Sequence, residues 1–312
     1  MSWLLIAITA YFILAIVNVA DKFIIEKVVN GPKTYTFLVG VAGALVALAA
    51  PWFLLWPGWP LFFFNLLVGS FFAGGLFFLY SALKGGEASR VFTLVGGMVP
   101  IFTVLFSLLV FKENFSLNQW LAILFLILGT IVISAMSIHH SIWFNIRRFL
   151  GIFDSNQWPV ILTAIFSALF FALFWVGSKQ AYNVQEFVSG FIWIRLGTFV
   201  TVLFLLIRKS SRQEIFSEMK KGNKNKNNKW LVLGNQGLGA LGGILQNYAV
   251  ALGSVALVTS LQGLQYALIL VLVTVMTFLY PNIIKEEYSN KRIYKKTLAI
   301  VLISIGLYFL VI

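Results

Sequence analysis

Apolar runs long enough to cross a bilayer alternate with short polar segments along the whole chain. A membrane-spanning helix needs about 20 mostly apolar residues, and the pattern predicts ten such helices. Their predicted ranges are Trp3–Ala20, Tyr35–Trp56, Leu61–Leu83, Ala88–Phe111, Leu117–Ser137, Trp158–Ser178, Phe187–Ile207, Trp230–Leu252, Val255–Leu279 and Lys296–Ile312. The predicted fold class is therefore an all-α, polytopic membrane protein with ten transmembrane helices.

Composition agrees with this pattern and excludes a soluble domain. Apolar residues make up 60% of the chain and charged residues 11%, whereas a soluble domain averages about 25% charged residues. The net charge of +13 lies in the short segments between apolar runs. Such a distribution carries information about membrane orientation, so we expect membrane lipid as a partner and no nucleic acid.

Two stretches of the chain follow the same order of features. Tyr80 is followed by an apolar run, the hinge 112–116 (Lys-Glu-Asn-Phe-Ser) and a second apolar run containing Gly129. Near the C-terminus, Tyr248, the hinge 285–289 (Lys-Glu-Glu-Tyr-Ser) and Gly306 stand in the same order. The separation between the copies is 168 residues at the tyrosines and 177 at the glycines. A duplicated helix pair of this kind is typical of transporters built from two related halves.

The first helix of each half also matches, with Lys22 over Lys179. The predicted division is a first five-helix repeat at residues 1–138, an interfacial linker at residues 139–157 and a second five-helix repeat at residues 158–312. Because each half has an odd number of helices, the two halves must cross the membrane in opposite directions. This predicts inverted repeats with a binding site between them, near the middle of the bilayer.

The residues of the first repeat resemble a known family. Ala82-Leu83 ends the third predicted helix, Pro100 lies inside the fourth, Glu113 stands in the hinge and Gly129 lies in the fifth, while Arg195-Leu196 stands in the seventh. With these motifs the chain resembles an EamA-type, ten-helix member of the drug/metabolite transporter superfamily. The resemblance implies a multi-pass transporter with both termini in the cytoplasm. The fourth helix of the second half lacks the proline, and the first half has no arginine at the place matching Arg195.

The distribution of positive charge predicts the opposite orientation. Twenty of the 23 Lys and Arg residues fall in the odd-numbered connections between predicted helices or in the first residues of the helix that follows. Because cytoplasmic loops carry an excess of Lys and Arg, we predict cytoplasmic odd-numbered loops and external termini, in the plasma or inner membrane. The basic run at 208–229 is expected to be a solvated loop near anionic lipid.

Arg195 is the most informative single residue. It is predicted about 12 Å from the nearer helix end, at 1.5 Å per residue, and an arginine at such a depth costs about 2.5–3.5 kcal/mol on insertion scales. A substrate anion would offset this cost. The alternative is an arginine that only braces the fold or extends to the interface.

Amide and hydroxyl side chains gather in the eighth and ninth predicted helices. They provide both hydrogen-bond donors and acceptors, which suits a zwitterionic or hydroxylated solute. The alternative is hydrogen bonding between helices. The candidate substrate-binding residues are Arg195, Asn235, Gln236, Gln246, Asn247, Gln262, Gln265, Tyr266, Lys179, Asp21 and Lys22. The last three belong either to the mouth of a cavity or to helix ends in solvent.

These observations predict a secondary, alternating-access transporter of small polar metabolites such as amino acids or related organic acids. The alternatives are a carrier of a lipid-linked or lipid-like substrate and an intramembrane enzyme. No phosphate-binding loop, catalytic constellation or metal-ligand set stands in the sequence, because His139-His140 has no third ligand. We therefore expect no cofactor, no metal and no enzymatic activity. The substrate, direction, coupling ion and oligomeric state are left open by the sequence.

Overall fold

A computed structural model describes residues 2–24, 31–85, 88–136, 158–222, 229–279 and 290–312. Within these ranges the chain is helical, with short connections and no strand. The helices of the first half are α1 (Ser2–Ile24), α2 (Pro32–Ala44), the 3-10 turn η1 (Leu45–Ala49), α3 (Ala50–Phe53), α4 (Trp59–Gly85), α5 (Ala88–Phe111) and α6 (Leu117–Met136). Those of the second half are α8 (Trp158–Val184), α9 (Phe187–Leu203), η2 (Phe204–Leu206), α10 (Lys209–Gly222), α11 (Lys229–Leu252), α12 (Val255–Ser260), α13 (Gln262–Leu279) and α14 (Asn290–Val311).

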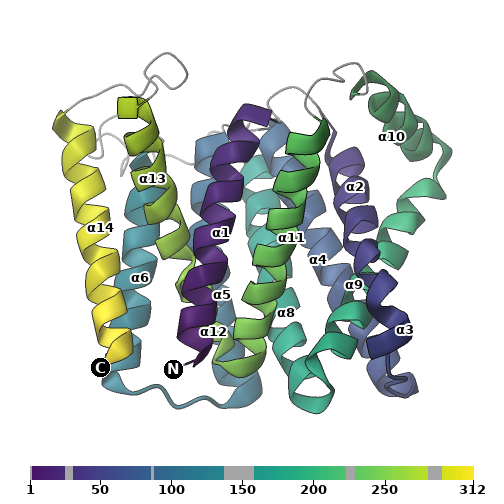
Figure 1. Ribbon diagram of the computed structural model, residues 1–312, viewed down its shortest axis with the longest axis horizontal. Coiled ribbons are helices and arrows are strands. Elements are labelled where there is room, and N and C mark those ends of the chain that lie inside the picture. Colours follow the sequence, from purple (N-terminus) through teal and green to yellow (C-terminus); the bar gives the residue numbers. More distant parts are fainter. Residues whose placement is uncertain (1, 25–30, 86–87, 137–157, 223–228, 280–289) are drawn as a thin grey trace.

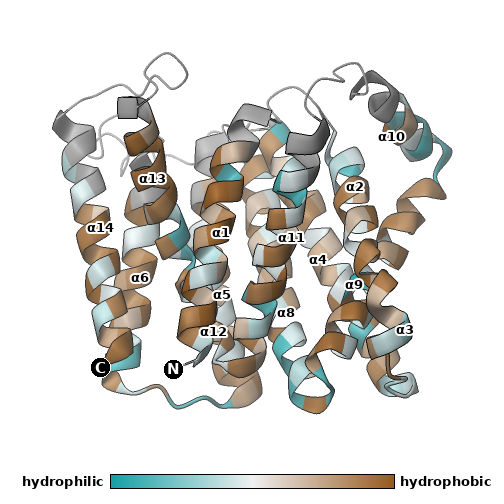
Figure 2. Ribbon diagram, in the orientation of Figure 1, coloured by the Kyte–Doolittle hydropathy of each residue, from teal (hydrophilic) through white to brown (hydrophobic). Residues whose placement is uncertain are grey.

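The helices stand roughly side by side as a single bundle (Figure 1). Among the described residues, seven helices are long and apolar enough to cross a membrane, and Leu117–Val132 and Thr297–Val311 are shorter apolar helices. Large apolar side chains such as Leu48 and Leu109 are exposed on the outside of the bundle, and apolar residues dominate the helices along their length (Figure 2). An apolar exterior suits contact with lipid. The predicted all-α, polytopic membrane fold is confirmed, and the arrangement is consistent with ten spans.

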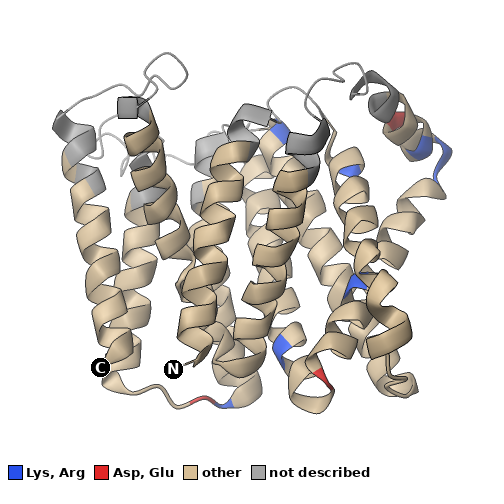
Figure 3. Cartoon of the chain, in the orientation of Figure 1, with Lys and Arg blue, Asp and Glu red and all other residues tan. Residues whose placement is uncertain are grey.

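Charged residues divide the bundle into two ends. Figure 3 shows both termini and the hinge 112–116 at one end, where few charges lie. Lys33, Lys84 and the basic residues of α10 lie at the other end. We call these the charge-poor end and the charge-rich end. The odd-numbered connections of the described helices therefore share one end, and which end faces the cytoplasm stays a prediction.

The basic run at 208–229 was predicted to be a solvated loop, and this prediction is wrong for its first part. Lys209–Gly222 forms α10, and its Ile215 is fully buried in a cluster with Phe37 and Val202. Lys33 Nζ and Glu214 Oε2 lie 2.8 Å apart and join α2 to α10. The charge density of this segment concealed a single apolar side chain that docks the helix on the bundle.

The contact between α6 and α14 is made twice, in the same way, by matched residues. A Cβ atom added to Gly129 would lie 2.5 Å from Ile303 Cγ1, and one added to Gly306 would lie 2.8 Å from Leu126 Cγ. Gly129 matches Gly306, and Leu126 matches Ile303 at the same spacing of 177 residues. A self-complementary contact of this kind indicates a two-fold relation between the halves.

A second matched contact lies between the third helix of one half and the first helix of the other. Gly74 and Gly75 of α4 face Phe170 and Phe171 of α8, and Gly242 of α11 faces Ile13 and Leu14 of α1. Spacings of 168 and 157 residues relate these pairs, as they relate Tyr80 to Tyr248 and Lys22 to Lys179. α1 and α8 run in opposite directions (Figure 1). These contacts support the inverted-repeat prediction, and the exact repeat boundaries stay a prediction, because residues 137–157 lie outside the described residues.

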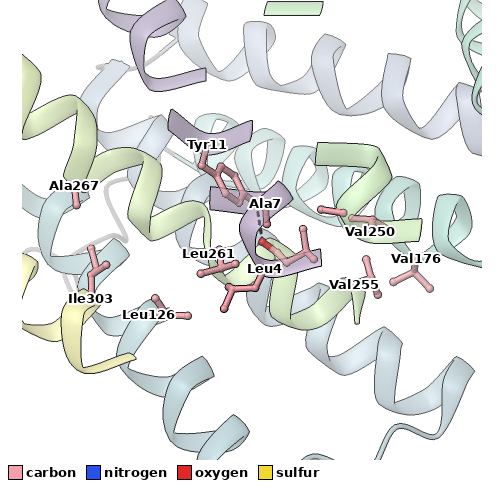
Figure 4. Close-up of a cluster of buried hydrophobic side chains, with 12 residues drawn as sticks. Leu4, Ala7, Tyr11, Leu126, Val176, Val250, Val255, Leu261, Ala267 and Ile303 are labelled. Atoms are coloured by element: carbon pink, nitrogen blue, oxygen red, sulfur yellow. Dashed lines mark hydrogen bonds between the residues drawn. The ribbon is translucent and has the colours of Figure 1, made fainter. Parts of the chain in front are cut away.

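The fourth helices of the two halves differ in continuity, against what proline content suggests. α5 continues through Pro100, whereas its counterpart, without a proline, is interrupted at Leu261 between α12 and α13. Near this interruption, Tyr11 Oη donates a hydrogen bond of 2.7 Å to the Val258 carbonyl. Figure 4 shows Tyr11 within the buried cluster that joins α1 to Val250 of α11 and Leu261. The tyrosine satisfies a backbone acceptor in a buried, apolar setting, where an unpaired acceptor would be costly.

Candidate functional site

Arg195 lies inside the bundle on α9, eight residues after the first residue of that helix. Two phenylalanine rings flank its guanidinium group, with Cζ 4.8 Å from the centroid of Phe72 on α4 and 5.0 Å from that of Phe191. A Cβ atom added to Gly43 of α2 would lie 3.6 Å from Arg195 Cδ. The arginine therefore stands where α2, α4 and α9 meet.

The guanidinium group of Arg195 has no anionic partner among the described residues. It is only partly buried, and the structure gives it no hydrogen bond or ion pair, so its contacts there are the two cation–π interactions. A cation–π contact stabilises a desolvated cation by about 2 kcal/mol but leaves the N–H donors free. Those donors lie in the plane of the group.

Two polar side chains extend this site toward α11. Tyr182 of α8 is buried and within electrostatic range of Arg195, and its hydroxyl donates a 3.0 Å hydrogen bond to Asn247 Oδ1. Asn247 Nδ2 donates to the Gly243 carbonyl at 2.8 Å. We call Arg195, Phe72, Phe191, Tyr182 and Asn247 the Arg195 site.

Other predicted amides continue the polar series across the bundle. Gln246 Nε2 donates to Tyr11 Oη at 3.2 Å, and Asn235 Nδ2 lies 3.4 Å from the Val17 carbonyl, also on α1. Asn235 and Gln246 thus share the face of α11 that lies toward α1. Their side chains connect helices, which fits the interhelical alternative as well as a cavity wall.

Of the predicted polar residues of α13, two bond to each other and the third has no hydrogen bond to a described residue. Gln262 Nε2 donates to Tyr266 Oη at 3.2 Å, and the Tyr266 hydroxyl lies against Gly96 of α5. Gln265 is buried, and the structure gives its amide no hydrogen bond to a described residue. Its donors and acceptor are therefore available to a solute or to water.

Gln236 is not brought to this series, because it is exposed on α11, away from the amides that face α1. The side chains of Asp21 and Lys22 lie outside the described residues, so their place in the site stays a prediction.

Lys179 lies in a polar cluster at the charge-poor end. Its Nζ donates a 2.9 Å hydrogen bond to the Ala251 carbonyl, near the end of α11. Glu113 Oε2, within electrostatic range of Lys179, accepts hydrogen bonds from Ser107 Oγ at 2.7 Å and Ser254 Oγ at 2.8 Å. The hinge of the first half is thereby fastened to the start of α12 in the second half. We call these residues the Glu113 cluster.

A tight helix crossing lies beside the Arg195 site, where the residues of α9 that flank Arg195 meet α4. A Cβ atom added to Gly69 of α4 would overlap the Ile194 carbonyl oxygen and the Thr198 nitrogen of α9. One added to Gly197 would lie 2.7 Å from Leu66 Cα. On the side of this crossing toward the charge-poor end, Asn65 and Gln185 exchange hydrogen bonds of 3.3 and 2.9 Å. Backbones this close leave no passage between α4 and α9.

Sequence reasoning missed several residues of these sites. Phe72 and Phe191 look like ordinary apolar residues of their helices, and no local pattern marks them. Glu113 was noted as a family motif, but its contact with Ser254 joins residues 141 positions apart. The available signal for Glu113 was the match between the hinge 112–116 and the hinge 285–289.

Comparison with known proteins agrees with the fold and with the family resemblance. The EamA-like transporter family matches residues 1–135, which confirms the resemblance to the drug/metabolite transporter superfamily. One solved structure, described only as "Crystal structure of protein", is 21% identical, with a TM-score of 0.65, and the match covers 98% of this chain and 96% of that one. That likeness concerns the fold alone. No curated protein matches the chain.

Proposed function

We propose that this EamA-type, multi-pass membrane transporter carries small polar metabolites with an anionic group, such as amino acids or related organic acids, by alternating access. The observation that carries the proposal is the guanidinium of Arg195, which lies inside an apolar bundle and has no anionic partner among the described residues. A charged side chain in the membrane interior is costly unless something pairs with it. A substrate carboxylate supplies that partner.

The flanking rings favour a flat anion. Phe72 and Phe191 lie close to the Arg195 guanidinium, so an anion approaches along its N–H edge. A carboxylate accepts two parallel hydrogen bonds from that edge. Tyr182 and Asn247 stand nearby with hydroxyl and amide groups for the polar remainder of the solute. A zwitterion or hydroxy acid fits this set of groups.

Transport by purified protein in liposomes tests the proposal. Liposomes that contain the protein and are loaded with an unlabelled amino acid or organic acid are expected to exchange it for labelled solute added outside. Protein-free liposomes loaded in the same way are not. The same panel includes an uncharged solute of similar size as a control. Exchange of the uncharged solute alone, or of a lipid-linked solute alone, would contradict the proposed substrate class.

Orientation is tested separately with single cysteines, since the chain has none of its own. Ser217 is exposed on α10 at the charge-rich end, and Asn114 is exposed in the hinge at the charge-poor end. If positive charge sets the orientation, a membrane-impermeant thiol reagent added to intact cells should label Asn114→Cys and not Ser217→Cys. The reverse labelling would restore the orientation that the family resemblance implies.

A further inference from the structure

The two halves make one matched pair of contacts unequally. α4 crosses α9 at Gly69, beside Arg195, where Thr198 Oγ1 also donates to the Gly69 carbonyl at 3.1 Å. The residue of α11 that matches Gly69 is Gly237, at the spacing of 168 residues that relates Tyr80 to Tyr248. No described residue lies within 4 Å of a Cβ atom added to Gly237. The contact present in one half is absent in the other.

The partner helix shows the same inequality. Thr198 of α9 matches Val41 of α2 at the spacing of 157 residues that relates Lys179 to Lys22. Thr198 is 1% exposed and Val41 is 36% exposed. Both α2 and α11 pack against α9, so the two uncovered positions lie on helices that share a neighbour. Each lacks the contact that its counterpart makes.

α11 is uncovered at some positions and packed at others. A Cβ atom added to Gly242 would still lie 2.9 Å from Leu14 of α1, as one added to its match Gly74 would meet Phe170. Gly234 and Gly237, which lie nearer the charge-rich end of α11, have no neighbour within 4 Å. Gly243, farther along α11, also has no neighbour within 4 Å, whereas its match Gly75 faces Phe171. The uncovered positions of α11 therefore include Gly234, Gly237 and Gly243.

Toward the charge-poor end, in contrast, side-chain hydrogen bonds hold the helices together. The reciprocal bonds of Asn65 with Gln185 and the Glu113 cluster both lie on that side of the Arg195 site. We propose that this structure is the state closed at the charge-poor end, and that the opposite state is reached when α11 closes on α2, with Gly237 against the backbone beside Val41. Glycine permits this approach because helix backbones meet only where side chains are small.

A pair of leucine substitutions tests the proposal. Gly237→Leu has room in this structure, so it is expected to keep the melting temperature and solute binding of the parent protein while losing tenfold or more of its exchange rate. Gly234→Leu is the matched control, because position 234 corresponds to Leu66, which already carries a leucine in the closed crossing. It should exchange solute normally. Normal exchange by Gly237→Leu would overturn the closure.

A second readout does not depend on transport. A double variant with Val41→Cys and Gly237→Cys is expected to form a disulfide under mild oxidation, because the closed state brings the two backbones within the 4.4–6.8 Å that a disulfide requires. Val41→Cys with Leu238→Cys, whose second site is exposed and turned to another face of α11, is the control pair. Equal or absent cross-linking in the two pairs would reject the proposal. Cross-linking at 237 in a protein that exchanges none of the solutes would uphold the closure and reject the proposed function.

Discussion

Replacing Arg195 with glutamine is expected to lower exchange of anionic and zwitterionic solutes by about tenfold to a hundredfold. Hydrogen bonds to a charged group contribute about 1.5–3 kcal/mol, and each 1.4 kcal/mol is a factor of ten in affinity. The defect should be smaller for uncharged solutes, because these do not use the guanidinium. Solute exchange and melting temperature are measured on the same protein samples.

Arg195→Lys is the matched variant for this prediction. It keeps the positive charge and loses the planar fork that binds a carboxylate through two parallel bonds. Lysine should therefore fold and insert, with weaker binding than arginine and stronger binding than glutamine. If both variants lowered the melting temperature and affected all solutes alike, Arg195 would be a structural brace for α2, α4 and α9 instead of a substrate ligand.

The helices of this protein were predictable because their signal is local. The predicted Ala88–Phe111 span matches α5 at both ends. The predicted Tyr35–Trp56 and Val255–Leu279 spans are each divided into shorter helices, which the apolar pattern did not predict. Apolar runs of membrane length specify helices, since the bilayer offers the backbone no other partner. The repeat was also predictable, and the matched contacts of Gly129 and Gly306 support it.

The candidate site was predictable only in part. Arg195 stands out in the sequence because charge is rare inside membranes, but the rings of Phe72 and Phe191 are brought to it from two helices whose apolar residues look alike. Whether an amide such as Gln246 faces a solute or another helix depends on its partner, here Tyr11 at a distance of 235 positions. The sequence did not predict α10, because its many charged residues indicate a solvated loop. The helix packs on the bundle through one buried apolar side chain, Ile215.

Replacing Gly197 with leucine is expected to destabilise the protein by about 3 kcal/mol or more. Overpacking a filled interior usually costs about 1–3 kcal/mol, because neighbouring side chains shift to make room. At Gly197 the neighbours are backbone atoms, Leu66 Cα at 2.7 Å and the Asn65 carbonyl oxygen at 2.9 Å from an added Cβ atom, and these cannot rotate away. α4 and α9 would have to separate.

That separation has a signature beyond lost stability. It would break the reciprocal hydrogen bonds of Asn65 with Gln185 and open the charge-poor end, so a cysteine placed at Asn65 should become reactive toward thiol reagents. The melting temperature of Gly197→Leu in detergent is compared with that of Gly234→Leu, where an added Cβ atom has no neighbour within 4 Å. Equal melting temperatures for the two variants would show that α4 and α9 tolerate a side chain at their crossing. The tight contact would then not be what closes this end of the bundle, and its closure would rest on the Glu113 cluster, where Ser254 and Lys179 bind across the two halves.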